Sequence, residues 1–235
     1  MIEVDGKHVL TELPELVEPS RTAVVVVDMQ HDFVSPEGAF AQLGVDVSAY
    51  EQLRPRLVSL LAAARRAGVL VLHLQNTALP DRRSDSPAQI RFNLRMHAAA
   101  RGGGPALRYT VPGTPGHAFV PDLAPEAGDL VVPKHRSSGF WGTSLDLLLR
   151  SNAIACLVVV GCTTEGCVDS TARDAMFSDY DVVVVRDGVA SDDARQHEAA
   201  LLLMEHRFEL TTCTELESTW EGAAAVPAAP SGGER

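Results

Sequence analysis

The sequence predicts an α/β protein with three layers, in which a mainly parallel, doubly wound, Rossmann-like sheet of six strands lies between two layers of helices. Short runs rich in β-branched residues recur along the chain, and segments with apolar residues at helical spacing separate them. Such alternation favours a parallel sheet covered by helices on both faces. With 235 residues the chain can bury one large core, so we expect a single folded domain.

The strands are predicted from continuous apolar runs. TAVVVVD, at residues 22–28, is the clearest of them, because a strand buried on both faces is apolar throughout. The expected strands, in chain order, are residues 22–28, 69–74, 130–133, 155–160, 182–186 and 208–212.

The helices are predicted from apolar residues three and four positions apart. In residues 50–67 this spacing is carried by four leucines, and Gly68 follows as a stop signal. The expected helices are residues 50–67, 87–98, 143–150, 165–179 and 192–206.

Three segments fall outside this alternation. Residues 1–20 contain two prolines and are expected to form an irregular lead-in to a folded domain at 21–220. Residues 76–118 form a long polar connection rich in Gly, Pro and Arg, and that length favours a functional role such as covering a site. Residues 221–235 are expected to be a disordered tail.

Composition excludes several classes of partner. The net charge of −11 argues against nucleic acid and against an anionic membrane surface. No apolar run reaches the roughly 18 residues of a membrane-spanning helix, and the first twenty residues lack the apolar core of a signal peptide. We therefore expect a cytoplasmic protein whose four cysteines form no disulfide framework, with Cys156 and Cys213 as buried structural thiols.

The most informative stretch is GCTTEGCVDSTARDAM, residues 161–176. It follows a buried strand and opens a helix for which Thr163 or Thr164 is a natural cap. Cys167 then falls in the first helical turn, where the helix dipole and unpaired backbone N–H groups favour the thiolate. The motif thus supplies a candidate nucleophile together with donors for an oxyanion.

Two further polar residues are expected beside Cys167. Asp28 and Lys134 each follow a predicted strand, and ligands of open α/β sheets bind beyond the carboxyl ends of the strands. Asp28 could take the thiol proton as a general base, and Lys134 could stabilise the thiolate and hold the carboxylate. The backbone N–H groups of Thr163 and Cys167 could bind the oxyanion, so this chemistry requires no metal and no cofactor.

These residues resemble a known family. Asp28 in VVVVDMQHDF, Lys134 in VVPKHRSSGFWGTSLDLLLR and Cys167 in VVVGCTTEGCVDSTARDA are similar to motifs of the isochorismatase-like cysteine hydrolases, over about residues 22–212. The resemblance implies an Asp–Lys–Cys catalytic triad and a non-proline cis peptide bond between Cys162 and Thr163, which would turn the Thr163 N–H toward the oxyanion. It also suggests a homodimer or homotetramer.

Within that family, metal-binding nicotinamidase-like members carry an Asp-x-His pattern after the second strand. This chain has QNTALPD at residues 75–81, without histidine, so we predict no metal. The segments Gly38–Ala49, LHLQN and SGF resemble the branch of ureidoacrylate and N-carbamoylsarcosine hydrolases, a group that also includes streptothricin hydrolases, which open a lactam. The expected substrate is therefore a small carbamoyl, ureido or cyclic amide, cleaved at a C–N bond through a thioester.

Four residues are candidates for binding that substrate: Phe33, Asn76, Phe140 and Trp141. Phe33 could form a wall of the pocket, Asn76 could hydrogen-bond an amide or carboxylate, and the two aromatic residues just past Lys134 could face the same crevice. Each could instead serve packing or a turn. Arg108 and Arg136 are further candidates for holding a substrate carboxylate.

Two other functions stay open. One is a vinyl-ether hydrolase of isochorismate type, although members with that activity commonly lack the cysteine. The other is a non-catalytic binding protein on the same fold, against which the presence of Asp28, Lys134 and Cys167 together speaks.

Overall fold

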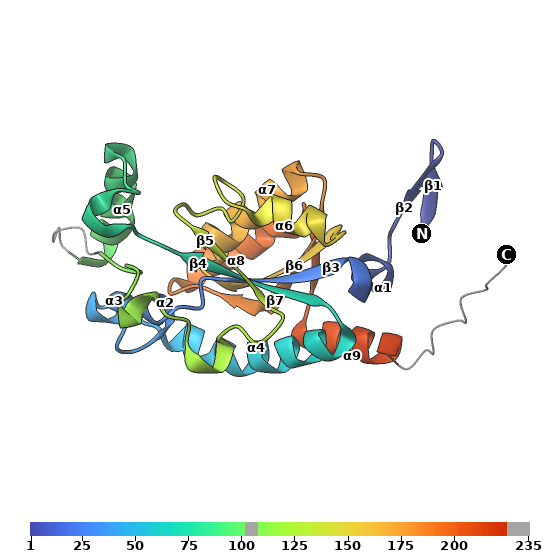
Figure 1. The fold of residues 1–235 in the computed structure, drawn as a ribbon, viewed down its shortest axis with the longest axis horizontal. Coiled ribbons are helices and arrows are strands. Elements are labelled where there is room, and N and C mark those ends of the chain that lie inside the picture. The colour runs from blue at the N-terminus through green and yellow to red at the C-terminus, as the bar shows by residue number, and fades with distance from the viewer. Residues whose placement is uncertain (102–107, 225–235) are drawn as a thin grey trace.

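The centre of the computed structural model is a parallel sheet of six strands in the order β5-β4-β3-β6-β7-β8, which confirms the predicted fold class (Figure 1). The structure describes residues 1–101 and 108–224. The strands are β3 (Thr22–Val27), β4 (Leu70–Asn76), β5 (Leu130–Lys134), β6 (Cys156–Cys162), β7 (Asp181–Ala190) and β8 (Glu209–Thr211).

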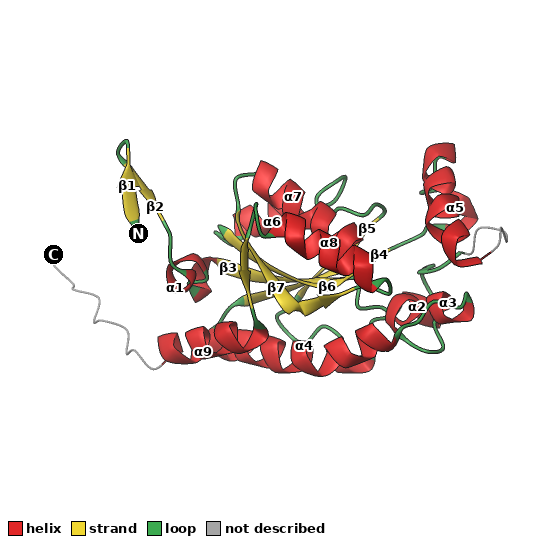
Figure 2. Cartoon of the chain, turned by 180° about the vertical axis from the view of Figure 1, so that it is seen from behind, coloured by secondary structure: helices red, strands yellow, loops and turns green. Residues whose placement is uncertain are grey.

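Helices cover both faces of the sheet, as Figure 2 shows from behind. On one face lie α4 (Ser48–Ala67) and α9 (Cys213–Ala224); on the other lie α6 (Leu145–Ser151), α7 (Asp169–Phe177) and α8 (Ala194–Met204). β3 shows why its sequence is apolar throughout: Val24 and Val26 join the core beneath α4, while Val25 and Val27 join the core on the opposite face. A central strand of a doubly covered sheet has no solvent face.

The order of the strands places the binding crevice. The chain runs from β3 outward through β4 to β5, then returns to the other side of β3 with β6 and continues outward. The carboxyl ends of β3 and β6 therefore lie at the point where the strand order reverses, which is where open α/β sheets bind ligands. Gly161 of β6 pairs with Val27 of β3 there, at a φ of +111°, and a side chain at this glycine would collide with the β3 backbone.

The N-terminal segment differs from the irregular lead-in that we predicted. It forms the antiparallel hairpin β1 (Ile2–Val4) and β2 (Lys7–Val9), the short helix α1 (Leu13–Leu16) and the 3-10 turn η1 (Pro19–Arg21). Asp5 and Gly6 both adopt positive φ in the turn of the hairpin. An Asp-Gly pair is a strong hairpin signal, so the sequence contained the information.

Other boundaries also differ. The predicted helix 165–179 is divided into a π-helical turn, η5 (Thr164–Val168), and α7. Residues 221–224, which we expected to belong to a disordered tail, instead form the last turn of α9; residues 225–235 lie outside the described part of the chain.

The long connection 76–118 contains η2 (Pro80–Arg82), α5 (Pro87–Arg101) and η3 (Pro115–His117), and η4 (Pro121–Leu123) follows it. The short helices α2 (His31–Val34) and α3 (Ala39–Gln42) follow β3. Figure 1 shows α5 and these two helices beyond the same end of the sheet. Over the described residues, no helix is both long enough and apolar enough to cross a membrane.

Candidate active site

Three strand ends bring Asp28, Lys134 and Cys167 together. Asp28 follows β3 directly, at a φ of +54°, and its N–H donates to the carbonyl of Leu74 in β4 at 3.2 Å. Lys134 is the last residue of β5, and Cys167 lies in η5, the turn that follows β6. The structure thus places the three predicted residues at one edge of the sheet, beside the switch point.

Lys134 is the centre of this group. Its Nζ lies 2.7 Å from Oδ2 of Asp28 and 3.3 Å from Sγ of Cys167, and it donates to the carbonyl of Arg136 at 3.1 Å. The side chain of Lys134 is completely buried, and that of Asp28 is nearly so. A buried ion pair is stable only when further hydrogen bonds support it. The Lys134 ammonium makes two such contacts besides the ion pair, whereas the ion pair is the contact of Oδ2 of Asp28.

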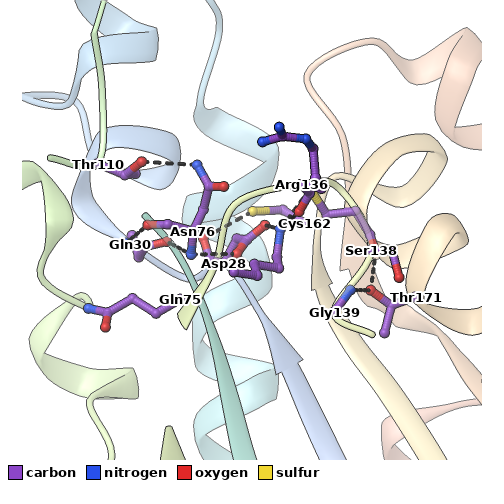
Figure 3. A network of polar contacts seen from close by, with 12 residues as sticks. Asp28, Gln30, Gln75, Asn76, Thr110, Arg136, Ser138, Gly139, Cys162 and Thr171 are labelled. Carbon is purple, nitrogen blue, oxygen red and sulfur yellow. Dashed lines mark hydrogen bonds and ion pairs between the residues drawn. The ribbon is translucent and has the colours of Figure 1, made fainter. Parts of the chain in front are cut away.

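The backbone of β4 supplies the other contact of Asp28. The Asn76 N–H donates to Oδ1 of Asp28 at 3.1 Å and to Oε1 of Gln30 at 2.8 Å. Nε2 of Gln30 in turn donates to the carbonyl of Asn76 at 3.0 Å and to the carbonyl of His117 at 2.8 Å. The side chain of Asn76 is held as well, because its Nδ2 donates to Oγ1 of Thr110 at 2.9 Å (Figure 3). This network fixes both the carboxylate and the strand end from which Asn76 projects.

Burial controls the protonation of the three groups. It raises the pKa of Asp28 above its ordinary range, against the opposing effect of the Lys134 ammonium. Burial also raises the pKa of the Cys167 thiol, to about 12, and the Asp28 carboxylate adds to that rise while Lys134 opposes it. For Lys134, burial lowers the pKa, but Asp28 and Cys167 outweigh it and leave the pKa above the ordinary value.

We expected the helix turn and Lys134 to favour the Cys167 thiolate. Cys167 is in the first turn after β6, as predicted, and Lys134 does lower its pKa, but burial has the larger effect and leaves the pKa raised. Thr163 occupies the N-cap position of η5 without a side-chain cap hydrogen bond, and the hydroxyl of Thr164 pairs with Nδ1 of His197 at 2.8 Å. With a pKa of about 12, the thiol of Cys167 is protonated at neutral pH.

A cavity of about 150 Å³ opens above this group and is called the catalytic cavity below. Asp28 and Cys167 line it, whereas Lys134, which contacts both, does not. The other residues lining it are Phe33, Phe40, Val45, Asn76, Gln89, Phe92, Asn93, Met96, Tyr109, His135, Arg136, Ser137, Cys162, Thr163, Glu165, Gly166 and Asp192.

Two of the four predicted binding residues line this cavity and two do not. Phe33 and Asn76 are placed as predicted. Phe140 instead packs into the core, with its ring centroid 5.9 Å from that of Tyr180. Trp141 is 66% exposed and lies outside the cavity, with the Arg136 guanidinium 5.7 Å from its ring. The loop after Lys134 turns toward α7, where the Gly139 N–H donates to the Thr171 hydroxyl, and so carries both aromatic residues away.

The remaining predicted features are also located. Arg136 lines the catalytic cavity, and Arg108 lines a smaller adjoining one. The Cys162–Thr163 peptide bond is cis, as the family resemblance implied, and Thr163 lines the cavity. All four cysteines are free thiols, and Cys156 and Cys213 are buried as expected.

The sequence analysis did not predict most of the residues that form the wall of the catalytic cavity. Helix α5, within the long connection, supplies Gln89, Phe92, Asn93 and Met96. Tyr109 and Phe40 complete an edge-to-face cluster with Phe33, with ring centroids 4.9 to 5.5 Å apart. The signals in the sequence were the length of the connection, which predicted a covering role, and the helix predicted at 87–98, but neither indicated particular residues.

In the part of the chain that the structure describes, no three His, Cys, Asp or Glu side chains are grouped so that they could hold a metal ion. The site is composed instead of a thiol, a buried ion pair and an apolar-walled cavity. Such a site on this fold defines the class of the protein as a cysteine hydrolase.

Comparison with known proteins agrees with that class. The isochorismatase domain family matches residues 22–216. Ureidoacrylate amidohydrolase RutB from Enterobacter sp. (strain 638) is 37% identical over 187 residues, covering 76% of this chain and 81% of that protein. A ureidoacrylate amidohydrolase RutB from Methylorubrum extorquens is 36% identical over 190 residues, covering 77% of each chain.

Solved structures show the same fold. A cysteine hydrolase from Pseudomonas syringae pv. phaseolicola 1448A superposes with a TM-score of 0.76 at 28% identity, covering 88% of this chain and 96% of that one. N-carbamoylsarcosine amidase from Thermoplasma acidophilum gives a TM-score of 0.63 at 26% identity, covering 82% and 96%.

The chain therefore belongs to the isochorismatase family. It is a hydrolase that acts on carbon–nitrogen bonds other than peptide bonds.

Proposed function

We propose that this protein hydrolyses a small ureido or carbamoyl amide of the ureidoacrylate kind, with Cys167 as nucleophile, Asp28 as general base and Lys134 as the cation that positions both. One observation carries the proposal: Nζ of Lys134 lies 2.7 Å from the Asp28 carboxylate and 3.3 Å from the Cys167 sulfur, at the floor of a cavity. The RutB relatives are ureidoacrylate amidohydrolases, which favours a ureido substrate.

The protonation states support this division of roles. Because the pKa of the Cys167 thiol is raised to about 12, the proton has to leave as the sulfur attacks the substrate carbonyl. The raised pKa of Asp28 makes its carboxylate a stronger base than an exposed aspartate. Lys134 stays charged throughout and stabilises negative charge on either oxygen or sulfur.

The first half of the reaction transfers the ureido carbonyl carbon to Cys167. Sγ of Cys167 forms a bond to the ureido carbon, Asp28 takes the thiol proton, and the backbone N–H groups of Thr163 and Cys167 stabilise the oxyanion. One C–N bond breaks and the proton on Asp28 goes to the departing amine, which leaves a thiocarbamate on Cys167.

Water then attacks that thiocarbamate with Asp28 again as base, and the thiol is regenerated. The carbamic acid released decomposes to carbon dioxide and an amine. Ammonia therefore appears whichever of the two ureido C–N bonds breaks first.

The experiment is ammonia release from ureidoacrylate, N-carbamoyl amino acids, maleamate, nicotinamide and simple amides, with a lactam followed by mass spectrometry because ring opening frees no ammonia. Cys167→Ala is expected to lower kcat/KM by at least about 1,000-fold. Cys213→Ala, at a buried thiol at the start of α9, is the matched control and is expected to keep activity. Equal activity in the parent and Cys167→Ala would reject the proposal.

A further inference from the structure

A second, smaller cavity adjoins the catalytic cavity and is called the side pocket here. The side pocket has a volume of about 40 Å³, room for one small polar group. Five residues line both spaces, so the two adjoin: Asn76, Gln89, Asn93, Tyr109 and His135. A substrate whose reacting carbon lies at Cys167 could therefore extend its other end into the side pocket.

The side pocket is lined by different chemistry from that of the catalytic cavity. The residues that belong to it alone are Thr77, Ala78, Arg82, Ser84, Asp85 and Arg108. Two of these side chains are cations and one is an anion, whereas Phe33, Phe40, Phe92 and Met96 make much of the catalytic cavity apolar.

Contacts around the side pocket position its two arginines. Nη2 of Arg108 donates to the carbonyl of Leu79 at 3.2 Å, a neutral acceptor that leaves the charge of this guanidinium in place. Nη1 of Arg82 is 3.5 Å from Oδ2 of Asp85, so this carboxylate offsets part of the positive charge. A guanidinium carries five donors in a planar fork that matches a carboxylate, and the bond to Leu79 uses only one donor of Arg108.

Part of the wall that the catalytic cavity does not share with the side pocket is acidic. Glu165, two residues before the nucleophile, accepts a hydrogen bond from the Ser191 hydroxyl, and Asp192 accepts one from the Tyr50 hydroxyl at 3.1 Å. Both carboxylates line the catalytic cavity. A negatively charged substrate group would be repelled from this wall and attracted toward the arginines, because like charges disfavour one another in a partly desolvated space.

From this arrangement we infer that the side pocket binds a carboxylate at the end of the substrate remote from the reacting carbonyl, with Arg108 as its main partner and Arg82 as a second. The inference rests on the proposed function and narrows it: the substrate is a ureido acid, oriented by its carboxylate, rather than a neutral urea or amide.

Arg136 is the competing partner for the substrate carboxylate. Its Nη1 donates to the carbonyls of Ser84 and His135, and in Figure 3 its guanidinium points away from Asp28.

The test compares ammonia release from ureidoacrylate and from its neutral methyl ester. The parent is expected to prefer the acid. Arg108→Gln is expected to lower kcat/KM for the acid by about tenfold or more, the usual size of a hydrogen bond to a charged group, and to leave kcat/KM for the ester unchanged. Arg108→Lys is expected to recover part of the loss, and Arg82→Gln to show the same selective effect in smaller degree.

Arg91→Gln is the matched control, because Arg91 is an exposed arginine of α5 that lines neither space. Unchanged turnover of the ester shows that each variant is folded. If the parent hydrolyses both compounds equally, or if Arg136→Gln loses the preference and Arg108→Gln keeps it, the inference is overturned. If the parent releases ammonia from neither compound, the ureido substrate of the proposed function fails and the inference fails with it.

Discussion

The Asp28–Lys134 ion pair allows a sharp test of how the site is held together. In Lys134→Met the side chain keeps nearly the same shape but loses its charge, and the Asp28 carboxylate remains buried without its partner at 2.7 Å. Removal of one member of a buried pair costs about 3–5 kcal/mol, because the other charge stays uncompensated. For a domain of this size that corresponds to a fall in Tm of roughly 6–20 °C.

The pH dependence of that loss has a definite sign. Lys134 lowers the pKa of Asp28 in the parent, so the variant's Asp28 has a pKa even further above its ordinary value. Between about pH 4 and that raised pKa, the folded variant binds more protons than the unfolded chain, and its free energy of unfolding therefore falls as pH rises. The variant is expected to be closest to the parent in acid and to diverge from it toward neutral pH.

Urea unfolding of the parent, Lys134→Met and the double variant Asp28→Asn/Lys134→Met measures this directly. The double variant removes both charges and is expected to recover most of the stability at about pH 8, since the cost belongs to the unpaired carboxylate. Two results would refute the account of the buried pair. One is a Lys134→Met protein that is as stable as the parent across about pH 5–8, and the other is a double variant that is less stable than Lys134→Met.

Three more predictions follow from the same geometry. Asp28→Asn is expected to lower kcat per folded molecule for ammonia release by at least about 100-fold, since an amide cannot accept the thiol proton. Full activity would contradict the assignment of the base. The rate at which iodoacetamide labels Cys167, located by peptide mass spectrometry, is expected to keep rising with pH because the thiol pKa is about 12, and a plateau near neutral pH would contradict this. Gly161→Ala is expected to lower the free energy of unfolding in urea by more than about 2 kcal/mol, since the new methyl group would collide with the Val27 backbone. Gly128→Ala is the control and is expected to cost less, because Gly128 also has a positive φ, of +99°, but open space around it. Equal losses for the two glycine variants would contradict the close approach of β6 to β3.

The parallel strands and the covering helices were predictable because burial imposes a pattern that does not depend on distant contacts. β3 and β6 are buried along their whole length, so their sequences had to be apolar throughout. The positions of Asp28, Lys134 and Cys167 followed from the same rule, since strand ends of a parallel sheet meet at one edge.

The rest depended on side-chain directions that sequence periodicity does not encode. Phe140 and Trp141 follow Lys134 closely, yet the loop turns toward α7 and removes both from the cavity. The raised pKa of the Cys167 thiol could not be predicted for a related reason: a helix dipole can be inferred from position, but the burial of the thiol and the place of the Asp28 carboxylate require the fold. The wall contributed by α5 comes from a polar connection whose path over the site has no local signature.

The central claim is that Cys167 carries the substrate's carbonyl carbon as a covalent thiocarbamate. Acid quenching of the parent during turnover of ureidoacrylate, followed by intact and peptide mass spectrometry, tests it most directly. The account predicts an adduct with the mass of the substrate-derived carbamoyl group on the peptide that contains Cys167, which is missing in Cys167→Ala. The account would be contradicted if the parent released ammonia steadily while Cys167 stayed unmodified at every quench time. It would also be contradicted if the same adduct were found on another residue.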